Sequence, residues 1–292
     1  MKQGKAICFA VLAAAFYAIN SPVSKLLLEK LSAAMLAALL YLGAGLGLFL
    51  VGLVQKKLGR GEREKPLTKK ELPYTIGMVV LDIAAPIFLM LGLRMTTAAN
   101  ASLLNNFEIV ATSVIALCIF KEVISKRLWL GIALVTAASL LLSFEDLSTF
   151  SFSAGSVFVL LACVCWGFEN NCTKMLSSKN PLEVVVIKGF CSGTGSLLIA
   201  IVRGECSLNV LYILFALLLG FVAYGLSIFF YIYAQRYLGA AKTSAYYAVS
   251  PFLSAILSLL IFRELPTMLY VAAFVIMLVG TYFVTIDGRE KQ

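Results

Sequence analysis

Apolar stretches separated by short polar turns run through almost the whole chain. Ten of them are long enough for a membrane-spanning helix, which takes about 20 mostly apolar residues. These stretches are residues 6–28, 32–55, 72–93, 96–120, 126–144, 153–176, 182–202, 207–235, 240–262 and 265–286. Their apolar residues are continuous rather than alternating with polar ones, which argues against a β-barrel. The pattern therefore predicts an all-α integral membrane protein with ten transmembrane helices and no soluble domain.

The second half of the chain repeats the first. Residues 94–102 (RMTTAANAS) recur 142 residues later as 236–244 (RYLGAAKTS). At the same offset IFKE, which ends at Glu122, recurs as IFRE, which ends at Glu264. Two copies of one pattern at a fixed spacing predict two related structural units.

A third match, between residues 17–25 (YAINSPVSK) and 166–174 (WGFENNCTK), extends the repeat to the start of each half. Each half holds five predicted spans, an odd number, so the second half enters the membrane from the opposite side. We expect two inverted five-helix repeats, residues 1–146 and 147–292. Inverted repeats with a site at their shared interface are the architecture of secondary transporters.

Composition and charge agree with a membrane protein of defined orientation. Hydrophobic residues make up 61% of the chain and charged ones 13%, whereas soluble domains have about 45–50% and 25%. The net charge is +9, and most cations fall in loops on one side of the ten-span layout. The positive-inside rule places both termini on the cytoplasmic side of a cell membrane, such as a bacterial inner membrane. The basic excess therefore indicates topology and not binding of nucleic acid.

Three carboxylates interrupt the apolar spans: Asp82 in the third, Glu108 in the fourth and Glu169 in the sixth. An ionised side chain at mid-bilayer costs about 2.5–3.5 kcal/mol, so each of them has to be paired, protonated or exposed to water. Lys188 lies at a depth similar to that of Glu169 and could pair with it, whereas Asp82 and Glu108 have no obvious basic partner. The alternative is that the acids are protonated and hydrogen-bonded between helices.

Polar side chains form stripes along four spans. Asn105, Glu108 and Thr112 share one face of the fourth span, since they follow each other at i, i+3 and i+7. The repeat predicts matching stripes in the ninth, first and sixth spans: Tyr247, Ser250 and Ser254; Tyr17, Asn20 and Ser24; Trp166, Glu169 and Thr173. Serine and threonine alone often serve only as contacts between membrane helices. With carboxylates and aromatic rings added, the stripes predict a central cavity.

The chemistry of these positions favours a cationic ligand. Carboxylates next to aromatic rings can bind an organic cation or amine through charge pairing and cation–π contact. The alternative for tyrosines near span ends is an interfacial belt, which we expect for Tyr41, Tyr74 and Tyr270. The predicted substrate-binding residues are Tyr17, Asn20, Asp82, Asn105, Glu108, Trp166, Glu169, Tyr224, Tyr247 and Ser250, with Glu108 and Asp82 also assigned to proton coupling.

Together, the paired motifs resemble the EamA family of the drug/metabolite transporter superfamily. The resemblance covers the whole chain and implies a ten-helix carrier whose cavity is lined by the first, third, fourth, sixth, eighth and ninth spans. Such carriers export amino acids, metabolites or drugs, or take up solutes such as choline, often with proton coupling. The family often has proline within the fourth span, as Pro251 stands in the ninth, but here that segment carries Glu108. This departure suggests a specialised substrate or coupling ion.

We therefore predict a secondary active transporter of small amine-bearing or cationic solutes, working by alternating access with proton coupling, in the export direction. Its partners would be the substrate, protons and the lipid bilayer, without a cofactor or metal. One alternative is an uptake carrier for choline-like quaternary ammonium solutes, and another is a channel. An intramembrane lipid-modifying enzyme is disfavoured because the chain has no histidine, no nucleophile-elbow motif and no clustered metal ligands.

Overall fold

The computed structural model describes residues 3–58, 67–120, 125–146, 151–176, 179–238 and 246–290. The first half contains α1 (Gln3–Ala18), α2 (Asn20–Leu27), α3 (Ala33–Lys57), the short 3-10 helix η1 (Lys69–Glu71), α4 (Leu72–Met95), α5 (Ala98–Leu104), α6 (Phe107–Phe120) and α7 (Lys126–Ser143). A small antiparallel hairpin follows, formed by β1 (Phe144–Asp146) and β2 (Ser151–Phe152).

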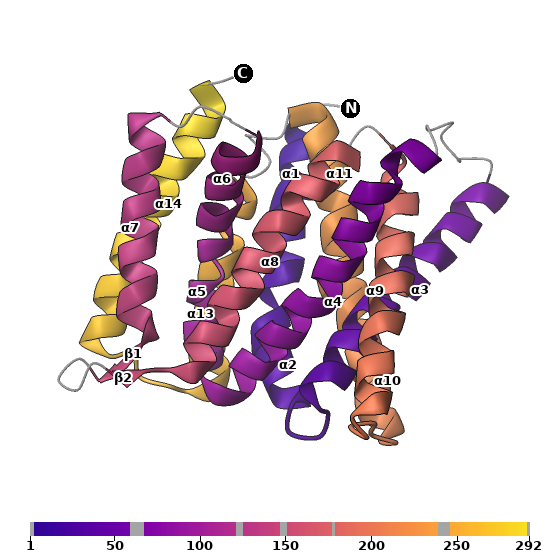
Figure 1. Ribbon diagram of the computed structural model, residues 1–292, viewed down its shortest axis with the longest axis horizontal. Helices are drawn as coiled ribbons and strands as arrows, with labels where there is room; N and C mark the ends of the chain where they lie inside the picture. The colour runs from indigo at the N-terminus through magenta and orange to yellow at the C-terminus, as the bar shows by residue number, and fades with distance from the viewer. Residues whose placement is uncertain are drawn as a thin grey trace.

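The second half contains α8 (Ala154–Leu176), α9 (Pro181–Val202), α10 (Val210–Leu219), the π-helical segment η2 (Gly220–Leu226), α11 (Ser227–Leu238), α13 (Ser250–Phe262) and α14 (Met268–Glu290). Figure 1 shows the helices side by side in a bundle, with both termini at one face and the hairpin at the opposite face.

The predicted ten-pass helical fold is confirmed. Among the described residues, seven helical segments are long and apolar enough to cross a membrane. Three shorter apolar helices, Trp129–Ser143, Ser250–Phe262 and Met268–Phe283, account for the remaining passes. Residues 239–245, which include the start of the ninth predicted span and most of the repeat motif at 236–244, lie outside the described residues.

In the described part of the first half, two passes are broken helices. The first span breaks at Ile19, between α1 and α2, where Pro22 has no N–H to donate to the carbonyl of Ala18. The fourth span breaks at Asn105 and Asn106, between α5 and α6, without any proline. There the side-chain amide of Asn106 donates to the Leu103 carbonyl over 3.0 Å and so competes with the helical hydrogen-bond ladder.

Helix pairing follows the repeat. The third and sixth passes pack together through α4 and α8, and their counterparts, the eighth and first, pack through α11 and α1. The second and seventh passes pair through α3 and α9, the fourth and ninth through α5 and α13, and the fifth and tenth through α7 and α14. Exchanging the two halves leaves this set of pairs unchanged, as expected for repeats related by a pseudo-twofold axis.

The helices α3 and α9 cross in close contact. A Cβ atom added to Gly189 would lie 2.4 Å from the Cα atom of Gly45, so the two backbones touch. Small residues at membrane helix crossings permit such contact. Gly45 and Gly189 thus serve as helix-packing positions, and this crossing places Lys188 and Tyr41 in the interior of the bundle.

Candidate functional site

The central polar cluster is built around the ammonium of Lys188 on α9. Its Nζ lies 3.0 Å from Oδ2 of Asp82 on α4 and 3.0 Å from Oε1 of Glu169 on α8. The side chains of the two acids are at most 3% exposed, and that of the lysine is 9% exposed. The predicted pairing of Glu169 with Lys188 is therefore present. The expectation that Asp82 has no basic partner is wrong, because Lys188 reaches both carboxylates.

Hydroxyl groups also hold both carboxylates. The Tyr41 hydroxyl on α3 donates to Oδ1 of Asp82 over 2.7 Å, and the Thr173 hydroxyl donates to Oε1 of Glu169. Tyr41 is 2% exposed. Its assignment to an interfacial belt is therefore wrong, since α3 turns this face toward α4 and not toward the membrane surface.

Glu108 lies beside this cluster and has a different environment. Its Oε1 accepts a hydrogen bond of 2.7 Å from the side-chain amide of Asn170, which also lies 3.2 Å from the Thr112 hydroxyl. Asn170 is the neighbour of Glu169 on α8, so the two acidic positions adjoin each other. Glu108 is half-buried, and no ion pair to it is found among the described residues.

The residues that correspond to the charged cluster by the repeat form a neutral counterpart. At the offset of 142 residues Tyr224 corresponds to Asp82, and Asn20 is the counterpart of Glu169. The Asn20 amide donates to the Tyr224 hydroxyl over 3.4 Å. The rings of Tyr41 and Tyr224 meet edge to face with centroids 5.1 Å apart. Tyr41 therefore connects the charged half of the interface to the neutral half.

Three predicted aromatic residues form one group. The Tyr17 ring lies 5.9 Å from the Tyr224 ring and 5.9 Å from the Tyr247 ring, measured between centroids. Tyr231 packs edge to face against Tyr247 at 5.0 Å. Tyr17 and Tyr247 are half-buried, and Tyr224 is buried. This tyrosine group joins the first, eighth and ninth passes.

The other predicted site residues lie elsewhere. Trp166 is buried in the apolar core, and the Asn105 side chain lies 3.9 Å from the sulfur of Cys163. The Ser250 hydroxyl donates to the Ala14 carbonyl over 2.7 Å, and the hydroxyls of Ser102 and Ser254 lie 2.9 Å apart. These serines act as contacts between helices, as the alternative interpretation of the serine stripes predicted.

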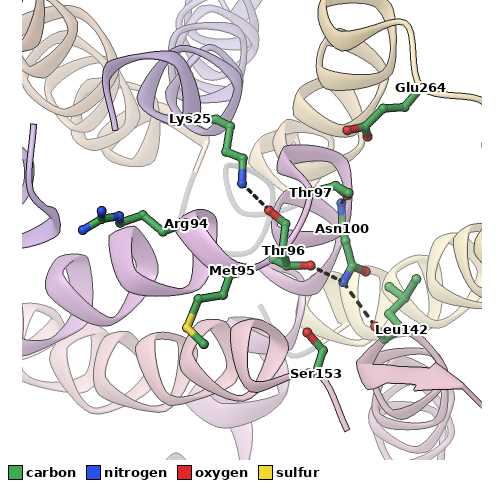
Figure 2. Close-up of a pocket in the computed structure, with 9 residues that line it drawn as sticks. All are labelled: Lys25, Arg94, Met95, Thr96, Thr97, Asn100, Leu142, Ser153 and Glu264. Atoms are coloured by element: carbon green, nitrogen blue, oxygen red, sulfur yellow. Dashed lines mark hydrogen bonds between the residues drawn. The ribbon is translucent and has the colours of Figure 1, made fainter. Parts of the chain in front are cut away.

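A pocket of about 400 Å³ opens at the face opposite the termini. Figure 2 shows its lining side chains, among them Lys25, whose ammonium donates to the carbonyl of Thr96 over 2.6 Å and also to that of Leu93. Arg94 and Glu264 lie on other sides of the pocket (Figure 2). Lys25 thus links the end of α2 to the C-terminal end of α4, where a positive charge interacts favourably with the helix dipole. This pocket is separate from the central cluster.

Sequence reasoning missed Tyr41 and Asn170. The only available signal for Asn170 was its position next to Glu169, within a polar run of three residues at 169–171 that is unusual for a membrane span. No comparable signal marked Tyr41, because one tyrosine in an apolar helix fits either the core or the interface.

Two related five-helix halves that bury a charged cluster between them define a membrane transporter with repeated architecture. Both halves match the family described as the EamA-like transporter family, over residues 4–144 and 153–286. The chain belongs to this family and is a transporter rather than an enzyme.

Two curated relatives agree with this assignment. An "Uncharacterized transporter" of Methanothermobacter thermautotrophicus is 26% identical over 96% of this chain and 85% of its own length. The "Uncharacterized transporter YyaM" of Bacillus subtilis is 22% identical over 68% of each chain. One solved crystal structure superposes with a TM-score of 0.69 at 16% identity, over 98% of this chain and 97% of the other, which shows the shared fold.

Proposed function

We propose that this transporter carries small amine-bearing or cationic organic solutes by alternating access, in exchange for protons and in the export direction. The observation that carries the proposal is an imbalance of charge. Asp82 and Glu169 contact Lys188, Glu108 is held by Asn170 beside them, and Lys188 is the only buried lysine or arginine among the side chains that the structure describes. With all four groups ionised their net charge is −2, which is expensive inside a membrane.

Glu108 is the carboxylate best placed to bind the transported cation. Asp82 and Glu169 already contact Lys188, whereas Glu108 is held by the amide of Asn170 and is half-buried. Asp82, although also predicted to couple protons, would act through its bond to Lys188. A proton or a substrate ammonium at Glu108 would remove one of the excess charges.

Competition between the two cations at one carboxylate yields exchange. An empty, ionised Glu108 would be a costly charge to move between the two sides, so the site would change its orientation with either a proton or a substrate bound. Outward movement of the substrate would then accompany inward movement of protons. Both termini lie on the cytoplasmic side in this proposal.

The tyrosine group supports a second candidate within the same mechanism. The Tyr17 ring lies 5.9 Å from the rings of both Tyr224 and Tyr247, and aromatic faces attract quaternary ammonium groups. A choline-like solute would use these rings together with the charge of Glu108. Because a quaternary ammonium has no N–H to donate, comparing methylated with unmethylated amines separates the two candidates.

The test is proton flux in proteoliposomes of the purified protein, with a pH-sensitive dye inside. Amines, amino acids and quaternary ammonium compounds are added one at a time, and protein-free liposomes correct for weak bases that cross the bilayer unaided. We expect a subset of amines to drive protons in the opposite direction. If the rate of uptake of a radiolabelled amine does not change with an imposed proton gradient, the proposed exchange is contradicted. If no cation is transported, the proposed substrate class is contradicted.

A further inference from the structure

We propose that Lys188 is a specificity-determining residue that restricts this transporter to solutes with a single cationic centre, an inference that rests on the function proposed above. Its ammonium lies 3.0 Å from each of two carboxylates, those of Asp82 and Glu169. This is the arrangement that a second ammonium group of a substrate would need. Lys188 occupies that position from within the chain.

The side chain of lysine and a diamine substrate carry the same cationic group. The end of a lysine side chain is a primary alkylammonium on a flexible four-carbon stem with three N–H donors, which is the same group as either end of a straight-chain diamine. Two of its donors have acidic partners within 3.0 Å. A free diamine could replace these contacts only if the Lys188 ammonium were absent.

The carboxylate pair does not depend on Lys188 alone for its orientation. Tyr41 donates to the other oxygen of Asp82, and Thr173 donates to Glu169. With Lys188 shortened, these hydroxyls would still hold the two carboxylates in place. The space vacated by the side chain would lie in the interior, since Lys188 is 7% exposed.

The proposed substrate position at Glu108 adjoins the position that the Lys188 ammonium occupies between Asp82 and Glu169. Glu108 accepts from Asn170, and Asn170 follows Glu169 directly on α8. A molecule with one ammonium at Glu108 could extend a second one to Asp82 and Glu169. The repeat supplies no second position of this kind, because the counterparts of Asp82, Glu108 and Glu169 are Tyr224, Ser250 and Asn20, all of them neutral.

The experiment compares wild type with Lys188→Ala, Lys188→Arg and the double variant Asp82→Asn/Lys188→Ala in proteoliposomes. The probes are an alkyl monoamine that drives proton flux in wild type and straight-chain diamines of increasing length. Binding of the same diamines is measured in parallel by calorimetry on detergent-solubilised protein. Lys188→Gln, which keeps more of the side-chain volume, replaces Lys188→Ala if that variant elutes as an aggregate.

We expect the preference for diamine over monoamine to rise about tenfold or more in Lys188→Ala, the gain from one charge-assisted contact. Lys188→Arg, which keeps the cation, should stay as wild type, and the double variant should lose most of the gain because one acidic partner is removed. An unchanged preference in Lys188→Ala, or efficient diamine transport by wild type, would overturn the inference.

The two proposals fail separately. If wild type moves no amine, the proposed function falls, and the calorimetric comparison of diamine binding still decides whether Lys188 occupies a cation position. If wild type exchanges monoamines for protons and the lysine variants gain no diamine binding, the function stands and the role of Lys188 falls.

Discussion

Asp82 and Tyr224 stand at equivalent positions of the two repeats, and one residue, Tyr41, contacts both. The Tyr41 hydroxyl donates to Asp82 over 2.7 Å, while its ring packs edge to face against Tyr224 at 5.1 Å. The two halves have thus diverged at one position into an ionisable and a neutral partner for the same side chain. Any movement that exchanges the roles of the halves has to break or re-form contacts at Tyr41.

Tyr41→Phe tests this connection, because it removes the hydroxyl and keeps the ring. We expect a loss of about 1.5–3 kcal/mol of stability, typical of a hydrogen bond to a charged group. This should appear as a lower melting temperature in detergent together with a changed pH profile of transport. Tyr282→Phe is the matched control, since Tyr282 is 62% exposed. Equal behaviour of the two variants would show that the bond to Asp82 contributes nothing measurable.

Glu108→Gln should abolish proton-coupled transport while leaving the fold intact. The amide can still accept the hydrogen bond from Asn170 at its oxygen, but it can neither bind a proton nor carry a negative charge. The measurement is amine-driven proton flux in proteoliposomes, with elution volume and melting temperature as checks of folding. Glu205→Gln, in the loop between α9 and α10, serves as the control. Coupling at the wild-type level in Glu108→Gln would assign the role to another group.

Removal of Lys188 should be more damaging than removal of one of its partners. Lys188→Met leaves two buried carboxylates without their shared cation, and breaking a buried ion pair in this way costs about 3–5 kcal/mol. Asp82→Asn leaves the lysine paired with Glu169. The double variant Asp82→Asn/Lys188→Met should recover part of the stability lost in Lys188→Met, because the two residues act together. If the decrease in melting temperature of the double variant equals the sum of the decreases of the two single variants, the coupling is contradicted.

Most of the fold could be predicted from the sequence because a bilayer leaves few choices. Backbone groups in hydrocarbon need internal hydrogen bonds, so long apolar runs must form helices, and the repeat at 94–102 and 236–244 specifies how the halves correspond. The break at Asn105 and Asn106 was not predicted, since it results from a side-chain bond of Asn106 and not from proline.

The site was predicted less completely, for a geometric reason. The depth of a residue can be counted along its own helix, which is how Glu169 and Lys188 were matched. Contact also depends on how each helix is rotated about its axis, and hydropathy does not specify that rotation when a helix is apolar all round. For this reason the contacts of Asp82 with Lys188 and with Tyr41 were not predicted, although each residue was identified as lying within an apolar span.

Gly189 should tolerate no side chain. Its added Cβ would lie 2.4 Å from Gly45 and 2.8 Å from the Tyr41 carbonyl, both backbone atoms that cannot move without separating α3 from α9. We expect Gly189→Ala to lower the melting temperature sharply or to prevent folding, measured by fluorescence-detected size exclusion. Gly4→Ala is the control, because nothing lies within 4 Å of its added Cβ. A monodisperse Gly189→Ala protein with wild-type stability would contradict the close crossing.

The orientation in the membrane can be tested with one native thiol. Cys206 is exposed in the loop between α9 and α10, at the face opposite the two termini. If both termini are cytoplasmic, as the distribution of lysine and arginine predicts, a membrane-impermeant maleimide added to intact cells should label Cys206. Cys206→Ser should then remove most of the signal. Labelling of Cys206 only after the cells are opened would place the termini outside and reverse the proposed direction of every step.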